Sequence, residues 1–166
     1  MKLRNSVGAG LIVASTLFSG LVMAQARADA VVKVTLIDKM GTPDLSKPLG
    51  LGMGMHADMN KAKMGIKTNP NTVNNGSVRF EVTNLASNLV HEVLISRITD
   101  ENQLLPFDQS RNKVDTESLQ TLGSVSEIDP NKTASITLDL KPGKYLLFCN
   151  VAGHYMAGMW AVIEIK

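Results

Sequence analysis

Apolar and polar residues alternate over several short stretches of the chain, and this period of two is typical of β-strands with one buried face. The alternation is clear at Val31–Asp38, at Ser77–Thr83 and in the T-A-S-I-T-L-D-L run that ends at Leu140. Denser apolar runs predict three more strands, at His91–Ile98, Lys144–Cys149 and Trp160–Ile165. Turn signals separate these stretches, among them Asn74-Asn75-Gly76, Asp129-Pro130-Asn131 and Lys141-Pro142-Gly143. The pattern predicts an all-β sandwich of antiparallel or mixed strands.

Two stretches depart from this pattern. Gly50–Lys67 is rich in Gly and Met and poor in β-branched residues, which predicts a Met-rich loop with room for a short helix. Leu105–Leu122 is polar and acidic, and we expect one short helix near Lys113–Leu122. The chain has no internal repeat, no Gly-rich phosphate loop and neither a G-x-S-x-G nor an H-E-x-x-H motif.

The first 30 residues predict a secretory signal peptide. Lys2 and Arg4 precede an apolar run at Leu11–Met23, and small residues at signal-peptidase spacing follow, so that cleavage is expected near residues 24–30. A retained N-terminal anchor helix is the alternative, but the apolar run is short for a membrane span and ends in small and polar residues. Residues 31–166 are then one domain of an exported, periplasmic protein with no membrane span.

Removal of this segment changes the charge balance. It carries three of the 17 Lys and Arg residues and one of the 15 Asp and Glu residues, which leaves 14 of each sign and a net charge of zero. No basic surface that would indicate nucleic-acid binding remains. The single cysteine, Cys149, has no partner in the chain. In an exported protein it predicts an intermolecular disulfide, a buried inert thiol or a metal-bound thiolate.

The residues that follow Cys149 favour the metal. Four residues separate Cys149 from His154, and four more separate His154 from Met159, so one short loop carries a thiolate, an imidazole and a thioether. Thiolate and imidazole together suit copper, and the soft thioether favours Cu(I). Gly153 and Gly158 allow the loop to turn back on itself.

A fourth ligand must come from elsewhere, and the chain offers only His56 and His91. His91 begins a predicted strand, where a sandwich core could hold it rigidly. Taken one at a time, these residues also fit ordinary packing: Cys149 as a buried core cysteine, His91 as a strand histidine bonded to backbone, and Met159 as core filling.

The segment from Gly143 to Trp160 resembles the copper loop of the cupredoxin, or blue copper, family, with spacing most like its rusticyanin, auracyanin and sulfocyanin branch. The run from Phe80 to Val93 is similar to the strand region that carries the family's first histidine. The resemblance implies a Greek-key β-sandwich with one mononuclear type 1 copper site. It also implies the ligand set: the strong ligands are His91, Cys149 and His154, and the axial ligand is Met159.

This chain departs from the family pattern at two positions. Ala152 stands where relatives often have Pro, and Glu92 stands where they often have Asn or Ser tying the two ligand loops together. Both changes touch the surroundings of the ligands, so they bear on redox potential more than on metal identity. Met156 competes with Met159 for the axial role, and the family spacing favours Met159.

The resemblance implies outer-sphere electron transfer, and we expect a monomeric one-electron carrier whose partner, a cytochrome, oxidase or reductase, docks near His154. An enzyme is not expected, because only three histidines are present and two are already assigned. A periplasmic copper-binding, delivery or tolerance protein is the alternative. It depends on residues 53–64, where the following side chains could form a second Cu(I) site or a packed flap: Met53, Met55, His56, Met59 and Met64.

Overall fold

Eleven β-strands make up the regular structure of the computed structural model, which describes residues 30–39, 44, 46–53, 59 and 62–166. The described residues contain no α-helix, and the predicted signal segment lies outside them except for Ala30. The strands are β1 (Ala30–Asp38), β2 (Met64–Asn69), β3 (Thr72–Val73), β4 (Gly76–Asn84), β5 (His91–Ile98), β6 (Phe107–Asp108), β7 (Lys113–Val114), β8 (Thr121–Ile128), β9 (Thr133–Leu140), β10 (Gly143–Phe148) and β11 (Trp160–Ile165).

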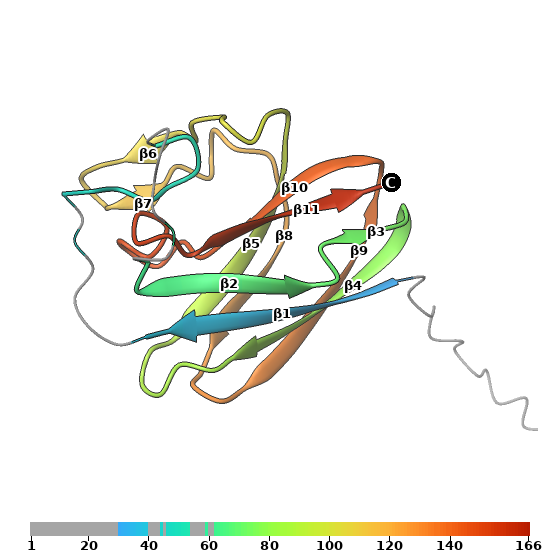
Figure 1. Cartoon of the computed structure of the whole chain (residues 1–166), viewed down its shortest axis with the longest axis horizontal. Coiled ribbons are helices and arrows are strands. Elements are labelled where there is room, and N and C mark those ends of the chain that lie inside the picture. The colour runs from blue at the N-terminus through green and yellow to red at the C-terminus, as the bar shows by residue number, and fades with distance from the viewer. Residues whose placement is uncertain (1–29, 40–43, 45, 54–58, 60–61) are drawn as a thin grey trace, which may run out of the picture.

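The strands form two sheets that face each other (Figure 1). One sheet has the order β2-β1-β4-β9, the other has the order β3-β11-β10-β5-β8, and β6 and β7 form a separate hairpin. Most pairs are antiparallel, whereas β1–β4 and β11–β3 are parallel. The chain crosses between the sheets after β2, β3, β4, β8 and β9, so the predicted Greek-key β-sandwich is confirmed.

In the first sheet, the alternation of apolar and polar residues in the sequence matches the alternation of buried and exposed side chains. In β1 and β4 every second residue is buried, and these apolar side chains form the core between the sheets together with Ile163 and Ile165 of β11. The intervening polar residues of β1 and β4 point away from that core, as expected for a sheet with one solvated face.

The neighbouring strands β5 and β10 of the second sheet are buried on both faces. In β10, Tyr145 and Leu147 enter the core between the sheets, while Leu146 and Phe148 enter a second apolar cluster on the outer face. Residues 105–119 and Leu51 cover that outer face. This double burial explains the dense apolar runs that predicted β5 and β10.

Two sequence-based expectations were wrong. The expected loop at Gly50–Lys67 contains the start of β2, whose Met64 and Ile66 face the core in antiparallel register with β1. The helix expected near Lys113–Leu122 is absent, because β7 and the beginning of β8 occupy this range.

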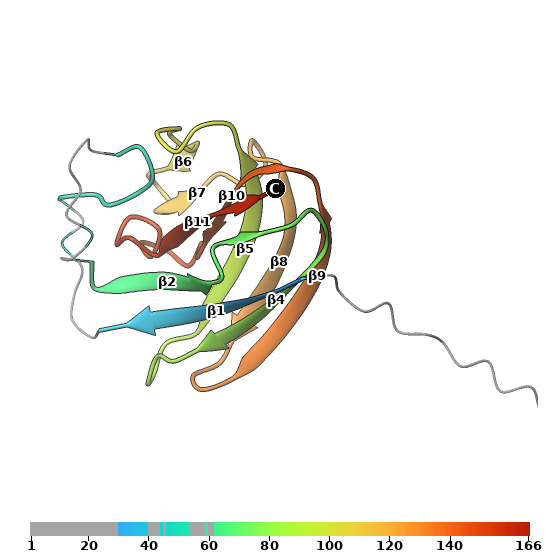
Figure 2. The ribbon, with the colours of Figure 1, turned by 45° about the vertical axis from the view of Figure 1, so that its right-hand side comes forward.

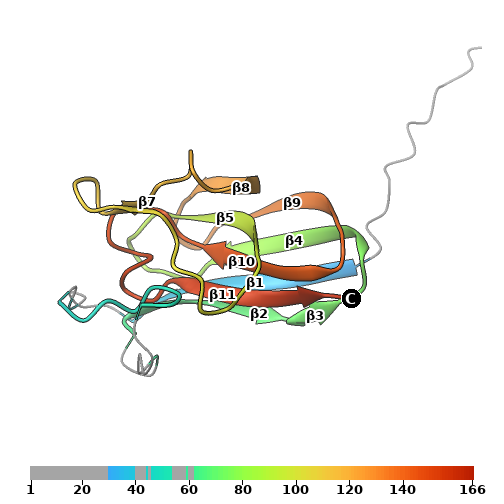
Figure 3. The same ribbon diagram turned by 90° about the horizontal axis from the view of Figure 1, so that it is seen from above.

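The loop between β10 and β11, residues 149–159, lies at the end of the sandwich opposite the C-terminus (Figure 3). The β6–β7 hairpin and residues 48–53, which we call the covering segment, gather at the same end (Figure 2). No helix among the described residues is long and apolar enough to cross a membrane.

Candidate metal centre

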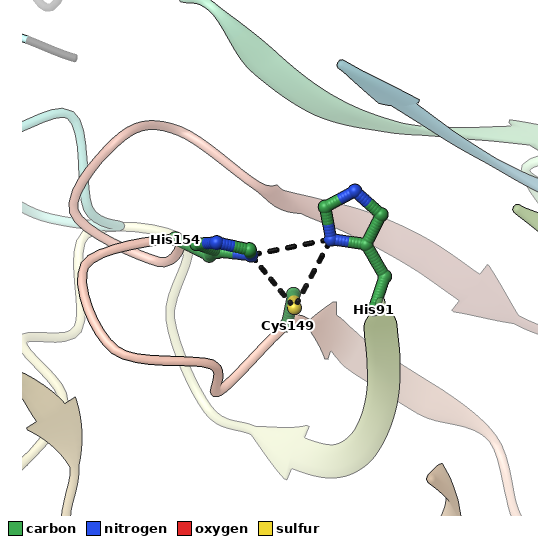
Figure 4. Close-up of side chains that lie close together, drawn as sticks. All are labelled: His91, Cys149 and His154. Carbon is green, nitrogen blue, oxygen red and sulfur yellow. Dashed lines mark hydrogen bonds between the residues drawn. The ribbon is translucent and has the colours of Figure 1, made fainter. Parts of the chain in front are cut away.

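His91, Cys149 and His154 converge at this end of the sandwich (Figure 4). The two Nδ1 atoms lie 3.2 Å apart, and the Sγ of Cys149 lies 3.9 Å from Nδ1 of His91 and 3.5 Å from Nδ1 of His154. His91 and Cys149 have no exposed surface, and His154 is 9% exposed. One thiol and two imidazoles from distant parts of the chain therefore meet in a buried site.

Sheet register brings two of these donors together. β10 pairs antiparallel with β5 so that Phe148 lies opposite Leu94. Continuing this register past Phe148 places Cys149 beside Val93, two residues from His91. Alternation then turns Cys149 and His91 toward the same core as Tyr145 and Leu147, which is why both side chains are inside.

The third donor is held by a loop that closes on itself. Cys149 N donates to Met159 O at 3.1 Å, and Met159 N donates to His154 O at 3.0 Å. Gly153 and Gly158 have φ angles of 82° and 92°, in the left-handed region that favours glycine. These bonds keep His154 and Met159 close to Cys149, although they follow it by five and ten positions in the sequence.

Asn150 anchors the start of this loop. Its Oδ1 accepts from Val114 N at 2.8 Å and its Nδ2 donates to Val114 O at 3.1 Å. Gly153 N also donates to Asn112 O, at 2.8 Å. The loop is thus tied to the β6–β7 hairpin at two points. The sequence analysis missed Asn150, although its position directly after Cys149 was a usable signal.

Asn84 plays the same part for the segment that precedes His91. It is fully buried, and its Nδ2 donates to Leu89 O and to Ile128 O, each at 2.8 Å, while its Oδ1 accepts from Ala86 N. All polar atoms of this side chain are used, so the turn between β4 and His91 is held in one conformation.

Burial controls the protonation of the donors. It raises the pKa of the Cys149 thiol to about 11, although backbone N–H groups of Glu92 and Val151 bind the sulfur and act in the opposite direction. Burial, followed by the nearby His154, lowers the pKa of His91 to about 4, and burial also lowers the pKa of His154. At neutral pH both imidazoles are neutral, so their nitrogens are available as ligands.

The triangle of donor atoms fits one metal ion. A triangle with sides of 3.2, 3.5 and 3.9 Å has a centre equidistant from its corners at about 2.1 Å, which matches typical bonds from a divalent ion to imidazole nitrogen and thiolate sulfur. Because burial raises the pKa of Cys149 to about 11, the thiol keeps its proton at neutral pH, and a cation bound among the three donors would favour its ionisation to the thiolate. Two imidazoles with one thiolate form the donor set of electron-transfer copper sites.

The two methionines of the loop have different surroundings. Met159 is fully buried and packs in the same apolar cluster as Cys149. Met156 is half-buried, packs with the outer cluster and lines an open cavity of about 500 Å³. Met159 is therefore the thioether on the side of the three converging donors.

Glu92 replaces the tie expected from Asn or Ser. Its side chain is half-buried and accepts a hydrogen bond from the backbone N–H of Asn150, and burial raises the pKa of its carboxyl group. A link between the two ligand-bearing segments is thus preserved by a carboxylate. The other departure, Ala152, is exposed.

The methionines of the Met-rich segment that the structure describes differ in burial. Met64 is 6% exposed in the core, Met59 is 38% exposed, and Met53 is half-buried beside the cavity that Met156 also lines. Met55 and His56 lie outside the described residues.

Comparison with known proteins agrees with this geometry. A sequence model described as copper binding proteins, plastocyanin/azurin family, matches residues 53–166, whereas no curated protein is matched. Reduced rusticyanin shares the fold at a TM-score of 0.50 and 16% identity, over 84% of this chain and 81% of that one. A rusticyanin with glutamine in place of a methionine gives 0.51 and 16%, over 84% and 80%.

Dithionite-reduced auracyanin from Roseiflexus castenholzii gives a TM-score of 0.47 at 14% identity, over 82% of this chain and 96% of that one. At such low identity the solved structures bear on the fold alone. The family match spans well over half of the sequence and includes all three converging donors. The chain therefore belongs to the plastocyanin/azurin family of copper-binding proteins.

Proposed function

We propose that the protein is an exported one-electron carrier that binds one copper ion through His91, Cys149, His154 and Met159. Copper would supply the Cu(II)/Cu(I) couple, and the family makes copper the expected metal. The observation that carries the proposal is the convergence of one thiol and two imidazole nitrogens in a buried triangle. Met159 is proposed as the weaker axial ligand because it is buried beside Cys149 and bonded through its backbone to both loop donors.

The surroundings of the site suit electron transfer because they resist rearrangement. His91 and Cys149 are fixed by strands of the core, and the ligand loop is fixed by Asn150 and by its internal hydrogen bonds. Burial also keeps solvent away from three of the four proposed ligands, all of which have no exposed surface. Little movement of protein or water would then accompany a change of charge at the site.

Electrons would enter and leave the site through the imidazole of His154. It is the only proposed ligand with exposed surface, and the neighbouring Ala152 is exposed while Val151 and Met156 are half-buried. Tyr155 and Ala157, which follow His154 in the loop, are buried and offer little surface to a partner. A redox partner such as a cytochrome would therefore approach through residues 151–154 and the cavity beside Met156.

A carrier is favoured over an enzyme by the number of metal-binding side chains. Among the described residues, the three donors form the only cluster of His, Cys, Asp or Glu with metal-ligand spacing. The whole chain has only three histidines. Periplasmic location is part of the proposal and is supported by the signal-like segment at residues 1–30.

Copper delivery is the second candidate, favoured by the presence of Met53 and Met156 on one open cavity beside the ligand loop. Two thioethers there could receive Cu(I). Anaerobic titration of the reduced protein with Cu(I) distinguishes the candidates. A second equivalent that disappears on Met53→Leu would favour delivery, whereas a stoichiometry of one would favour the carrier.

Spectroscopy and rapid kinetics test the carrier. The copper-loaded protein should show an intense visible thiolate charge-transfer band and an EPR signal of one Cu(II), and a cytochrome should oxidise its reduced form within a second in stopped flow. Cys149→Ala serves as the matched control and should show neither the band nor the electron transfer. Absence of electron exchange on this timescale in protein with the intact band would contradict the carrier role.

A further inference from the structure

The covering segment (residues 48–53) is bonded to the part of the ligand loop that carries Met159. Leu49 N donates to Met156 O at 2.8 Å, and Trp160 Nε1 donates to Leu49 O at 2.7 Å. Met156 precedes Met159 by three residues, and Trp160 follows it directly. The backbone N–H and C=O of one residue, Leu49, from a distant part of the sequence therefore fix both ends of the short stretch that contains Met159.

Close packing at Gly158 also holds this stretch against Leu49. A Cβ atom added to Gly158 would lie 3.0 Å from Cβ of Ala62 and 3.5 Å from Cβ of Leu49, and the φ of Gly158 is +92°. The backbone of Gly158, just before Met159, is thus in direct contact with Leu49 of the covering segment and with Ala62, which lies two residues before β2. It has neither the space nor the conformation for a larger residue.

The covering segment also holds the turn that carries His154. The hydroxyl of Tyr155 points to Leu51 O at 3.4 Å, and its ring lies so close to Gly50 that an added Cβ would meet it at 2.8 Å. Tyr155 is 1% exposed and packs edge-on against Phe148, with ring centroids 5.9 Å apart.

We propose that the covering segment positions the thioether of Met159, and that the indole N–H of Trp160 is the main bond through which it does so. The inference rests on the proposed role of Met159 as axial ligand. A methionine side chain has three rotatable bonds and is a weak ligand, so its position depends on the backbone that carries it. The axial ligand tunes the redox potential of such copper sites. Segment 48–53 would therefore adjust the potential without contacting the metal.

A purely structural role is the competing explanation, and matched variants separate the two. Trp160→Phe keeps an aromatic ring and removes the N–H donor. Tyr145→Phe is its control, because it removes the buried hydroxyl that donates to Lys141 O at 2.8 Å near the opposite end of β10. Both variants lose one hydrogen bond, but only Trp160→Phe should change the copper EPR spectrum and the reduction potential.

A second pair of variants changes the covering segment at Gly50, where it packs against Tyr155. Gly50→Ala forces the covering segment away from Tyr155, whereas an added Cβ at Gly65 in β2 meets nothing within 4 Å. Gly50→Ala should alter the spectrum and speed copper loss to a chelator by roughly three- to tenfold, which corresponds to about one net hydrogen bond. Gly65→Ala should leave both unchanged. This pair decides the question if Trp160→Phe does not fold.

A double-variant cycle shows whether the effect passes through the thioether. In a Met159→Leu background, Trp160→Phe should no longer shift the potential. An equal shift in both backgrounds would overturn the proposal, as would wild-type spectra for both Trp160→Phe and Gly50→Ala. The absence of a charge-transfer band in copper-loaded wild type would instead contradict the proposed function itself.

Discussion

Replacing Asn150 by alanine should destabilise the protein more than any other change of a polar side chain in the ligand loop. The side chain is 8% exposed and makes two hydrogen bonds to the backbone of Val114, which is 2% exposed. Alanine removes both bonds and leaves the N–H and C=O of Val114 without these partners in a buried place.

The magnitude follows from these contacts. Each hydrogen bond contributes about 0.5–1.5 kcal/mol net, and a buried backbone group left unpaired costs roughly 1–3 kcal/mol. Water that enters the vacated space recovers part of this loss, so we expect the free energy of unfolding to fall by about 2–4 kcal/mol. For a domain of this size, such a change lowers the melting temperature by roughly 6–14 °C.

Urea unfolding of the copper-free protein, followed by circular dichroism, measures this loss without the contribution of the metal. Asn88→Ala is the matched control, because Asn88 is exposed and its Oδ1 accepts a long hydrogen bond, 3.5 Å, from the hydroxyl of Ser87. It should change the free energy of unfolding by less than about 0.5 kcal/mol. A loss below about 1 kcal/mol for Asn150→Ala, with an unchanged urea dependence, would refute the assigned anchoring role.

Three further outcomes can be measured on the same protein. Cys149→Ala should abolish the visible charge-transfer band while far-ultraviolet circular dichroism keeps its β signature, because the core does not depend on one thiol; loss of the fold would contradict this. Met159→Leu should retain copper and raise the reduction potential in voltammetry, because an alkyl group favours Cu(II) less than a weak thioether donor does, and a lower potential would contradict the axial assignment. The copper-free protein should lose stability as the pH falls from about 6.5 to about 4. Burial lowers the pKa of His91 to about 4, so the unfolded chain binds a proton across this window that the folded chain does not. Urea midpoints at pH 7 and pH 4.5 measure this effect, and a His91→Gln variant should show a smaller difference between them.

The strands with a clear apolar pattern and the metal-binding side chains could be predicted from the sequence. β1, β4, β5, β9, β10 and β11 all coincide closely with predicted strands, because each has either one or two buried faces and the matching apolar pattern. The three donors that converge were also predicted. Cys149 and His154 followed from side-chain chemistry and loop spacing, whereas the choice of His91 over His56 rested on its place at the start of a strand and on the resemblance to the cupredoxin family.

Edge strands and long-range anchors were not readable. β8 contains Gly123 and an exposed Leu122, and as the edge of its sheet it pairs only with β5, so its apolar pattern is weak. Where a helix was expected, Val114 and Leu119 are buried although they lie five positions apart, a spacing that does not place them on one helix face. Val114 is buried because it belongs to the β6–β7 hairpin, which Asn150 anchors. Leu49 contributes only its backbone N–H and C=O to its bonds with Met156 and Trp160, and since almost any residue offers these groups, the sequence does not single out Leu49 as the partner.

The site is therefore supported by two systems of different physical character. The apolar core fixes His91 and Cys149, so changes there act mainly through the stability of the whole sandwich. Hydrogen bonds of Asn150 and Leu49 fix the loop that carries His154 and Met159, so changes there act directly on the positions of these two side chains. Variation in the covering segment and in the β6–β7 hairpin can consequently alter the properties of the bound metal while the fold remains intact.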